Sequence, residues 1–327
     1  MRNLNRRGFL ALTGAASIAV STKVAWSDTY PSKPITVVVP YPAGGGSDAI
    51  GRLVADAVGA GLSQSIVVEN RGGAAGSIGG GEVARSAADG YTILVGGSAP
   101  LAANKVIQGD LAYDPQKDFT PISLIAETPL IMIGGKDIPM NTVSDVIEFA
   151  KANPGKVAIG NAGLGAKGHI AAALFAQKAG IQVNFAAYRG SAPLLADLLG
   201  GHIALAIDTP GTYVPHVKEG ALKAFGVTSL QPLASLPDVP TIAEQGVEDF
   251  EATLWYGCVG PAGMPDEIVQ KISAVIADWT QTPEGQEKLL QRDVAAIGGS
   301  PADLKAAMDN EIEAIQSLVD TGVIPRQ

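Results

Sequence analysis

The sequence feature that most limits the fold is a unit of apolar strand, glycine-rich loop and helix that recurs along the chain. The first unit has a β-branched run at 35–39, a loop at 40–48, and then apolar residues spaced as on one helix face. Further strands are expected at 65–69, 91–95, 157–159, 183–186 and 202–207. Right-handed crossovers bring such loops to the carboxyl edge of a parallel sheet, so the pattern predicts an α/β fold.

The loop at 40–48 combines bare backbone with the start of a helix. Gly44, Gly45 and Gly46 lack Cβ atoms, so a ligand can come close to the main chain, and the first N–H groups of the following helix carry partial positive charge. An anion or a carboxylate suits such a place. The alternative is that the glycines only form a tight turn, with Ser47 or Asp48 capping the helix, and the loop alone does not separate the two.

The unit begins again after a change of pattern near 119–128, which indicates two α/β lobes. The second series contains a glycine loop at 160–168 that is built like the first. Three helices are then expected to pack back on the first lobe, at 266–280, 283–291 and 301–318. We assign 28–128 and 250–327 to lobe 1 and 129–249 to lobe 2, with the glycine loops facing each other across a cleft.

Residues 1–27 are expected to be an export signal rather than part of the fold. Arginines at 2, 6 and 7 precede an apolar stretch too short for a permanent membrane span, and small residues at 25–27 offer cleavage before Asp28. The segment Asn-Arg-Arg-Gly-Phe-Leu at 5–10 fits a twin-arginine signal. An ordinary secretory signal with two arginines is the alternative, and either route predicts a free, not membrane-embedded, periplasmic protein.

The negative net charge of the chain limits which partners it can bind. The chain has 23 basic and 32 acidic residues, and removal of the four basic residues in 1–27 leaves a net charge of about −13. Nucleic acid is therefore not an expected partner. A bound anion has to be held by local dipoles against this overall field. The lone Cys258 cannot form an internal disulfide and is expected to be a small buried residue.

Two loops match dinucleotide-binding patterns. Residues 163–168 read G-x-G-x-x-G, and 44–49 read G-x-G-x-x-A with an acid, Glu69, after the next strand. Tyr41-Pro42-Ala43 intervenes between the first strand and its glycines, however, and no acid follows the second loop near 184–189. A nucleotide-dependent exported enzyme therefore stays the lesser alternative.

Other signatures of catalysis are missing from the sequence. It contains no phosphate loop, no G-x-S-x-G elbow and no H-E-x-x-H, and its three histidines are not spaced as helical metal ligands. We expect no catalytic residues, no cofactor and no metal. What remains is binding: Lys167 and Arg189 lie in loops where either could neutralise a carboxylate, or could be solvated surface. Asp48 is expected to cap a helix, while Asp208 could receive a ligand's donor group.

Six motifs, in order along the chain, carry a resemblance to a known family. They are Tyr-Pro-Ala-Gly-Gly-Gly-Ser-Asp at 41–48, Asn-Arg-Gly-Gly-Ala-Ala-Gly at 70–76, Ala-Tyr-Arg-Gly-Ser-Ala-Pro at 187–193, Asp-Leu-Leu-Gly-Gly-His-Ile at 197–203, Leu-Pro-Asp-Val-Pro-Thr at 236–241 and Trp-Tyr-Gly at 255–257. Over essentially the whole chain after 27, the sequence resembles the Bug family, the periplasmic solute-binding receptors of tripartite tricarboxylate transporters.

The resemblance implies a type II periplasmic binding protein fold with the ligand cleft between two lobes. A monomer is expected to close on a small carboxylate by hinge motion at 127–130 and 250–254, and to deliver it to membrane subunits of the transporter. The family grips its ligand through backbone groups and ordered water. The family's ligand loops match 43–48 and 160–165 of this chain. Together with the residues singled out from the sequence itself, the expected ligand-binding residues are Tyr41, Ala43, Gly44, Gly45, Gly46, Ser47, Asp48, Ser98, Gly163, Leu164, Gly165, Ala166, Arg189 and Asp208.

The second loop departs from the family pattern. Where the family often has a hydroxyl after the glycines, this chain has Gly163-Leu164-Gly165-Ala166, which removes a donor and adds apolar surface. We therefore expect a mono- or dicarboxylate with an apolar or aromatic body rather than a citrate-like ligand. A sensor partner of a membrane kinase would bind the same ligands and differ only in the protein it docks on, so it stays an alternative.

Overall fold

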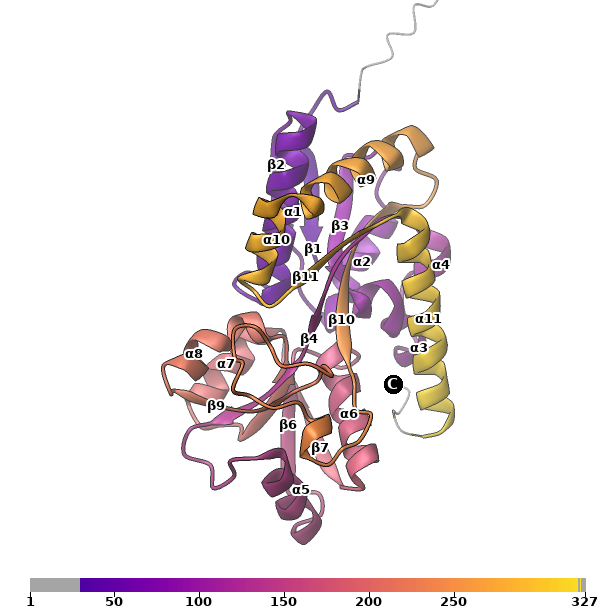
Figure 1. The fold of residues 1–327 in the computed structure, drawn as a ribbon. Helices are drawn as coiled ribbons and strands as arrows, with labels where there is room; N and C mark the ends of the chain where they lie inside the picture. Colours follow the sequence, from indigo (N-terminus) through magenta and orange to yellow (C-terminus); the bar gives the residue numbers. More distant parts are fainter. Residues whose placement is uncertain (1–29, 323, 325–327) are drawn as a thin grey trace, which may run out of the picture. The chain divides into compact units, whose positions relative to one another are not determined.

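The computed structural model describes residues 30–322 and 324, and the proposed export signal lies outside them. The described residues from 31 onward form one compact unit built on two β-sheets (Figure 1). Within the described part of the chain, no helix is both long and apolar enough to cross a membrane. The mixed α/β fold with two sheets confirms the fold class expected from the sequence.

The first sheet contains six strands in the order β11-β4-β10-β3-β1-β2. Their bounds are β1 Ile35–Val39, β2 Ile66–Asn70, β3 Thr92–Gly97, β4 Phe119–Pro129, β10 Thr253–Pro261 and β11 Ala295–Gly299. Strands β1, β2 and β3 are parallel, as the repeated unit predicts, because each is followed by a helix that returns the chain. Strand β10 instead runs antiparallel to both β3 and β4, and β11, which the sequence did not predict, pairs antiparallel with β4.

Helices from both ends of the described chain cover this sheet. They are α1 Gly46–Leu62, α2 Ser77–Ala84, α9 Asp266–Gln281, α10 Pro283–Leu290 and α11 Pro301–Asp320, with the short segments η1 Ala74–Gly76, η2 Ala99–Ala103, α3 Asn104–Ile107 and α4 Pro115–Asp118. Helix α9 packs on α1, where Gly61 leaves room for Val275, and α11 packs on β4. The last three helices thus return to the first sheet, as predicted.

The second sheet contains five strands in the order β7-β6-β8-β5-β9. Its elements are β5 Ile131–Gly135, α5 Val143–Ala152, β6 Val157–Asn161, α6 Lys167–Ala179, β7 Val183–Ala187, α7 Ser191–Leu199, β8 Leu205–Asp208, η3 Pro210–Thr212, α8 Val214–Lys218, β9 Leu222–Val227 and η4 Ala243–Gln245. Strand β6 is parallel to β7 and β8, so the loops that follow these three strands meet at one edge.

The chain passes between the sheets twice, from β4 into β5 and back into β10 (Figure 1). Buried Thr228 ties the two crossings together: its Oγ1 accepts from the N–H of Leu130 at 2.7 Å and donates to the carbonyl of Ala252 at 2.5 Å. A third tie joins Asp293 to Ser235, whose Oγ donates to the carboxylate at 2.6 Å. The lobe boundaries at 128/129 and 249/250 stay a prediction that lies close to these crossings.

Candidate functional site

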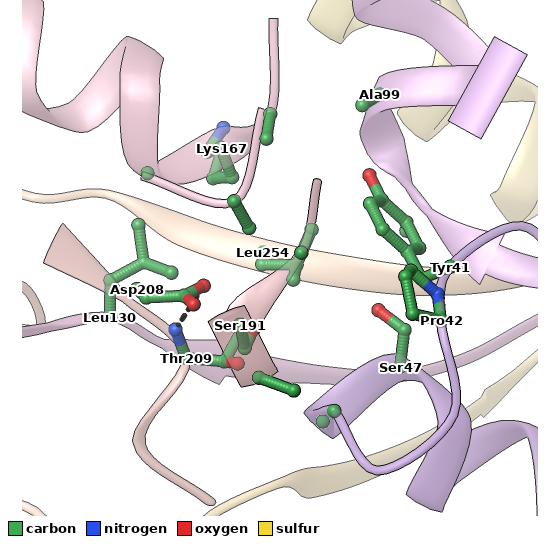
Figure 2. Close-up of a pocket in the computed structure, with 18 residues that line it drawn as sticks. Tyr41, Pro42, Ser47, Ala99, Leu130, Lys167, Ser191, Asp208, Thr209 and Leu254 are labelled. Atoms are coloured by element: carbon green, nitrogen blue, oxygen red, sulfur yellow. Dashed lines mark hydrogen bonds between the residues drawn. The ribbon is translucent and has the colours of Figure 1, made fainter. Parts of the chain in front are cut away.

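A small inner cavity lies where loops from the two sheets meet (Figure 2). Its wall comes from the β1–α1 loop (Tyr41, Pro42, Gly45, Gly46, Ser47), the end of β3 (Gly97, Ala99), the two crossings (Leu130, Leu254), the β6–α6 loop (Ala162, Ala166, Lys167, Gly168), the β7–α7 loop (Gly190, Ser191, Ala192) and the end of β8 (Asp208, Thr209). Its volume is about 30 Å³, room for about two water-sized groups or one carboxylate.

Three helices begin at this cavity, α1, α6 and α7. Their N-cap residues are Gly45, Ala166 and Gly190, and within residues 30–322 no side chain caps any of the three. Among the helices that begin elsewhere in the described part of the chain, α5 and α11 are capped by the hydroxyls of Thr142 and Ser300, whereas α2 and α9 have no side-chain cap, so it is the meeting of three starts at one place that sets this cavity apart. The unpaired first-turn N–H groups and the positive ends of three dipoles therefore face one space, an arrangement that favours an anion.

The first glycine loop is held in place by Asp48, which is 5% exposed. Its carboxylate accepts from the N–H of Gly44 at 3.0 Å, from Arg52 Nε at 3.1 Å and from Asn70 Nδ2 at 2.9 Å. Burial alone would raise the pKa of Asp48, but these hydrogen bonds outweigh it and lower the pKa. Asp48 thus fixes the loop around the start of α1.

Asp208 places a second, deeply buried carboxylate in the cavity wall, with 4% of its surface exposed. It accepts from the N–H of Thr209 and from the hydroxyl of Tyr213, each at 2.8 Å, and it also bonds Ser191. Burial raises the pKa of this carboxyl. None of the ion pairs found among residues 30–322 includes Asp208.

The lysine in the cavity wall is already neutralised. Lys167 Nζ lies 2.9 and 3.0 Å from the two carboxylate oxygens of Glu311, and the two side chains are 14% and 10% exposed. Because Lys167 opens α6 and Glu311 lies in α11, the pair joins helices that belong to different sheets. Lys167 therefore holds the two sides together rather than offering a free charge to a ligand.

An outer cavity of about 350 Å³ adjoins the inner one and shares Tyr41 and Ala162 with it. Exposed Arg189 lines it, together with the loop at 73–76. In that loop Ala74 and Ala75 have φ of 47° and 49°, a left-handed conformation that costs alanine about 1–2 kcal/mol each. The strained loop lines the outer cavity, and the carbonyl of Ala75 accepts from Asn104 Nδ2 at 3.1 Å.

Comparison with known proteins identifies the architecture. A profile of the tripartite tricarboxylate transporter family receptors, TctC, matches residues 50–322. The chain belongs to this receptor family. The protein BugT of Bordetella pertussis (strain Tohama I) is 32% identical over 98% of this chain and 99% of its own length.

Solved structures agree with the family. The structure of the periplasmic binding protein BugD is 32% identical and superimposes with a TM-score of 0.85, covering 91% of this chain and 100% of BugD. The R. palustris protein Rpa4515, solved with adipate, is 33% identical with a TM-score of 0.88 over 91% of this chain and 100% of its own. The family and these neighbours are periplasmic binding proteins, and this chain is a receptor of the same TctC/Bug type.

The predicted site residues of this receptor fall into three groups. Tyr41, Gly45, Gly46, Ser47, Ala166 and Asp208 line the inner cavity. Tyr41, Gly163, Leu164 and Arg189 line the outer one. Ala43, Gly44, Asp48, Ser98 and Gly165 lie outside the linings of these two cavities in the described part of the chain. Ser98 is nevertheless fully buried between two lining residues, and its Oγ has no hydrogen-bond partner among residues 30–322.

Several residues that line the inner cavity were not among the predicted site residues. Ser191 and Thr209 are polar residues that directly follow strand ends, a signal that could have found them, because such positions meet at the carboxyl edge of the sheet. Leu130 and Leu254 lie at the crossings that were predicted only as a hinge. No local sequence pattern marks these two as wall residues, since their place depends on how the sheets meet.

Proposed function

We propose that this receptor captures a small mono- or dicarboxylate, aromatic acids included, and delivers it to the membrane subunits of a tripartite tricarboxylate transporter. The observation that carries the proposal is the convergence of α1, α6 and α7, all without side-chain caps, on one cavity. A carboxylate there accepts from backbone N–H groups and is stabilised by three helix ends. Such local dipoles act even in a chain of negative net charge.

The two cavity sizes suggest how the ligand lies. The inner cavity of about 30 Å³ suits one carboxylate, whereas the outer cavity of about 350 Å³ has the size of a small-molecule pocket. A ligand body would then extend past Tyr41 toward Leu164, which is 38% exposed. Exposed Arg189 offers a cation to a second carboxylate. The adipate held by Rpa4515, a linear dicarboxylate, supports this class of ligand for the present chain.

The proposal also covers how the two lobes close and where in the cell the receptor acts. Lobe 1, residues 28–128 and 250–327, and lobe 2, residues 129–249, would close as a hinge at 127–130 and 250–254, where Thr228 ties the crossings together. Of the expected ligand-binding residues, those that line the two cavities are the ones that contact the ligand in this proposal. The receptor acts as a monomer in the periplasm after removal of residues 1–27, and it needs no cofactor and no metal.

A thermal-shift screen of residues 28–327 against carboxylic acids, with nucleotides as controls, tests the proposal. A ligand present at 100 times its dissociation constant adds roughly 2.7 kcal/mol to the unfolding free energy, a clear rise in melting temperature. Stabilisation by carboxylates supports the receptor and names its substrate class. A response to nucleotides alone would contradict it and favour the enzyme suggested by the glycine patterns.

A further inference from the structure

The inner cavity contains a feature that a plain anion site does not need. Asp208 is 4% exposed in its wall, so a bound carboxylate would meet a second carboxylate at short range. Like charges that share a buried site repel each other strongly. The only lysine of this wall, Lys167, is bound to Glu311, and Asp208 has no ion pair within residues 30–322.

The hydrogen bonds of Asp208 leave it able to accept once more. The N–H of Thr209, the hydroxyl of Tyr213 and the side chain of Ser191 occupy three positions on a carboxylate that offers about four. Three donors aimed at it mark the group as an acceptor. The buried hydroxyls around it include Tyr256, whose pKa rises through burial and through the Asp208 charge. A donor from the ligand would fill the remaining position.

Asp208 and the anion-binding helix end lie within the reach of one small ligand. A Cβ placed on Gly46, in the first turn of α1, would lie 2.8 Å from Thr209 Oγ1, and one on Gly45 would lie 3.9 Å from Ser191 Oγ. Figure 2 shows Ser47 and Asp208 extending into the space from opposite sides. In a cavity of about 30 Å³, the carbon next to a carboxylate held at the start of α1 is the position from which a donor group would meet Asp208.

From this geometry we infer that Asp208 determines specificity, selecting carboxylates that carry an amino or hydroxyl group on the α-carbon. The inference rests on the proposed function, since it adds a second requirement to the same cavity. The ligand's carboxylate accepts from the helix N–H groups, and its α-substituent donates to Asp208. An ammonium group meets this requirement best, because it also neutralises the buried charge.

Calorimetry with matched acids tests the inference. The probes are succinate, malate and aspartate, and 3-phenylpropanoate, phenyllactate and phenylalanine, so each series keeps its carbon skeleton and changes only the α-substituent. We expect wild-type protein to bind an α-substituted member at least tenfold more tightly than its unsubstituted parent. Asp208→Asn, which keeps the shape but removes the charge, should reduce this ratio to threefold or less.

The control variant is Asp197→Asn in α7. Asp197 also accepts from a tyrosine hydroxyl, that of Tyr188 at 2.8 Å, but lies outside the cavity wall, so its variant should keep the full ratio. A melting curve shows whether each variant is folded, and Tyr213→Phe, which removes one donor to the carboxylate, should retain the preference if Asp208→Asn does not fold.

Three results would overturn the inference. The first is equal or tighter binding of the unsubstituted parents by wild-type protein, and the second is a preference that survives in Asp208→Asn. The third is affinity for the parents that rises on acidification only when Asp208 is present, which would make Asp208 a protonated donor to the ligand. In all three cases carboxylates still bind, so the proposed function stands; if no carboxylate binds any variant, both fail.

Discussion

The two glycine loops look alike in the sequence, but they face different partners in the structure. In the first, Gly45 and Gly46 line the inner cavity, and Asp48 holds the loop from behind. In the second, Gly163 has φ of 147° and packs against Ala75, 3.3 Å from where its Cβ would be. Gly165 has φ of 82° and would place a Cβ 2.8 Å from Asn104 Oδ1.

The two glycine loops use their bare backbone for different contacts. The first loop leaves its backbone open toward the cavity, whereas the second uses the missing Cβ atoms to lie close to the segment 73–76 and to α3, which belong to the other side of the molecule. The N–H of Gly165 is not free for a ligand either, because it donates to His169 Nδ1 at 3.2 Å. The same pattern thus lines the inner cavity through Gly45 and Gly46 in the first loop and brings the two sides into contact through Gly163 and Gly165 in the second.

Of the changes that distinguish the two loops, acidification should have the largest effect on stability, because it acts on His169 beside the second loop and spares Asp48 in the first. His169 is 1% exposed, and burial lowers its pKa to about 4. The folded protein binds this proton less readily than the unfolded chain, so stability that is complete above pH 6.5 is lost as pH falls toward 4, by up to about 3 kcal/mol. The pKa of Asp48 is lowered instead from 3.8, so the support of the first loop stays intact over this range.

Urea unfolding at pH 7.0, 5.5 and 4.5 measures this difference. Wild-type protein should lose stability steadily over the range, whereas His169→Gln, which cannot take up the proton, should start lower at pH 7.0 and change much less. Equal slopes for the two proteins would show that other groups cause the acid sensitivity and that the second loop does not depend on neutral His169.

Filling the first loop should weaken ligand binding strongly while the protein still folds. In Gly46→Ala the new Cβ would lie 2.8 Å from Thr209 Oγ1, inside a cavity of about 30 Å³. Overpacking of this kind costs about 1–3 kcal/mol, so we expect the dissociation constant measured by calorimetry to rise about 100-fold. The same close contact exists without ligand, so the melting temperature of the free protein should also fall by a few degrees, and calorimetry well below the transition measures binding to folded protein.

Gly135→Ala is the matched control for this variant. Gly135 ends β5 away from the cavity, and its Cβ would meet nothing closer than 3.6 Å, an ordinary contact. It should bind the ligand as wild-type protein does. Normal binding by Gly46→Ala would mean that the ligand does not use the start of α1, and the contrast between the two loops would lose its functional side.

The helices and strands could be predicted from the sequence more accurately than the contacts between them. Strands β1 and β7 and the C-terminal helices were predicted within a few residues, because apolar periodicity, glycine and proline act locally. Strand β11 was missed because Ala295–Gly299 contains two glycines and two alanines, and it forms only because β4 offers an edge. Pairing with β4, rather than the β-propensity of its own residues, therefore makes this segment a strand.

The candidate site shows the same limit. Asp208 could be named as a ligand acceptor from its position after a strand, but its lack of a cation depends on Glu311 binding Lys167 from a helix about 140 residues away. Equally, nothing local to Gly163 or Gly165 indicates that their free space is taken by Ala75 and Asn104. A glycine pattern reports that something comes close to the backbone, and only the fold reports what.

Breaking the ion pair Lys167–Glu311, which lies beside the second loop, should have the smallest effect, a modest loss of ligand affinity. Lys167–Glu311 joins α6 to α11 with both side chains nearly buried, so an opening hinge would have to break it. In Glu311→Gln the closed form loses this tie, and the ligand must supply more of the closing free energy. We expect the dissociation constant to rise about fivefold, equal to roughly 1 kcal/mol.

The control is Glu284→Gln, whose partner Lys288 lies in the same exposed helix, so that affinity should not change. If Glu311→Gln lowered only the melting temperature and left affinity intact, the pair would be packing that persists in every state, and the second loop would not take part in closure.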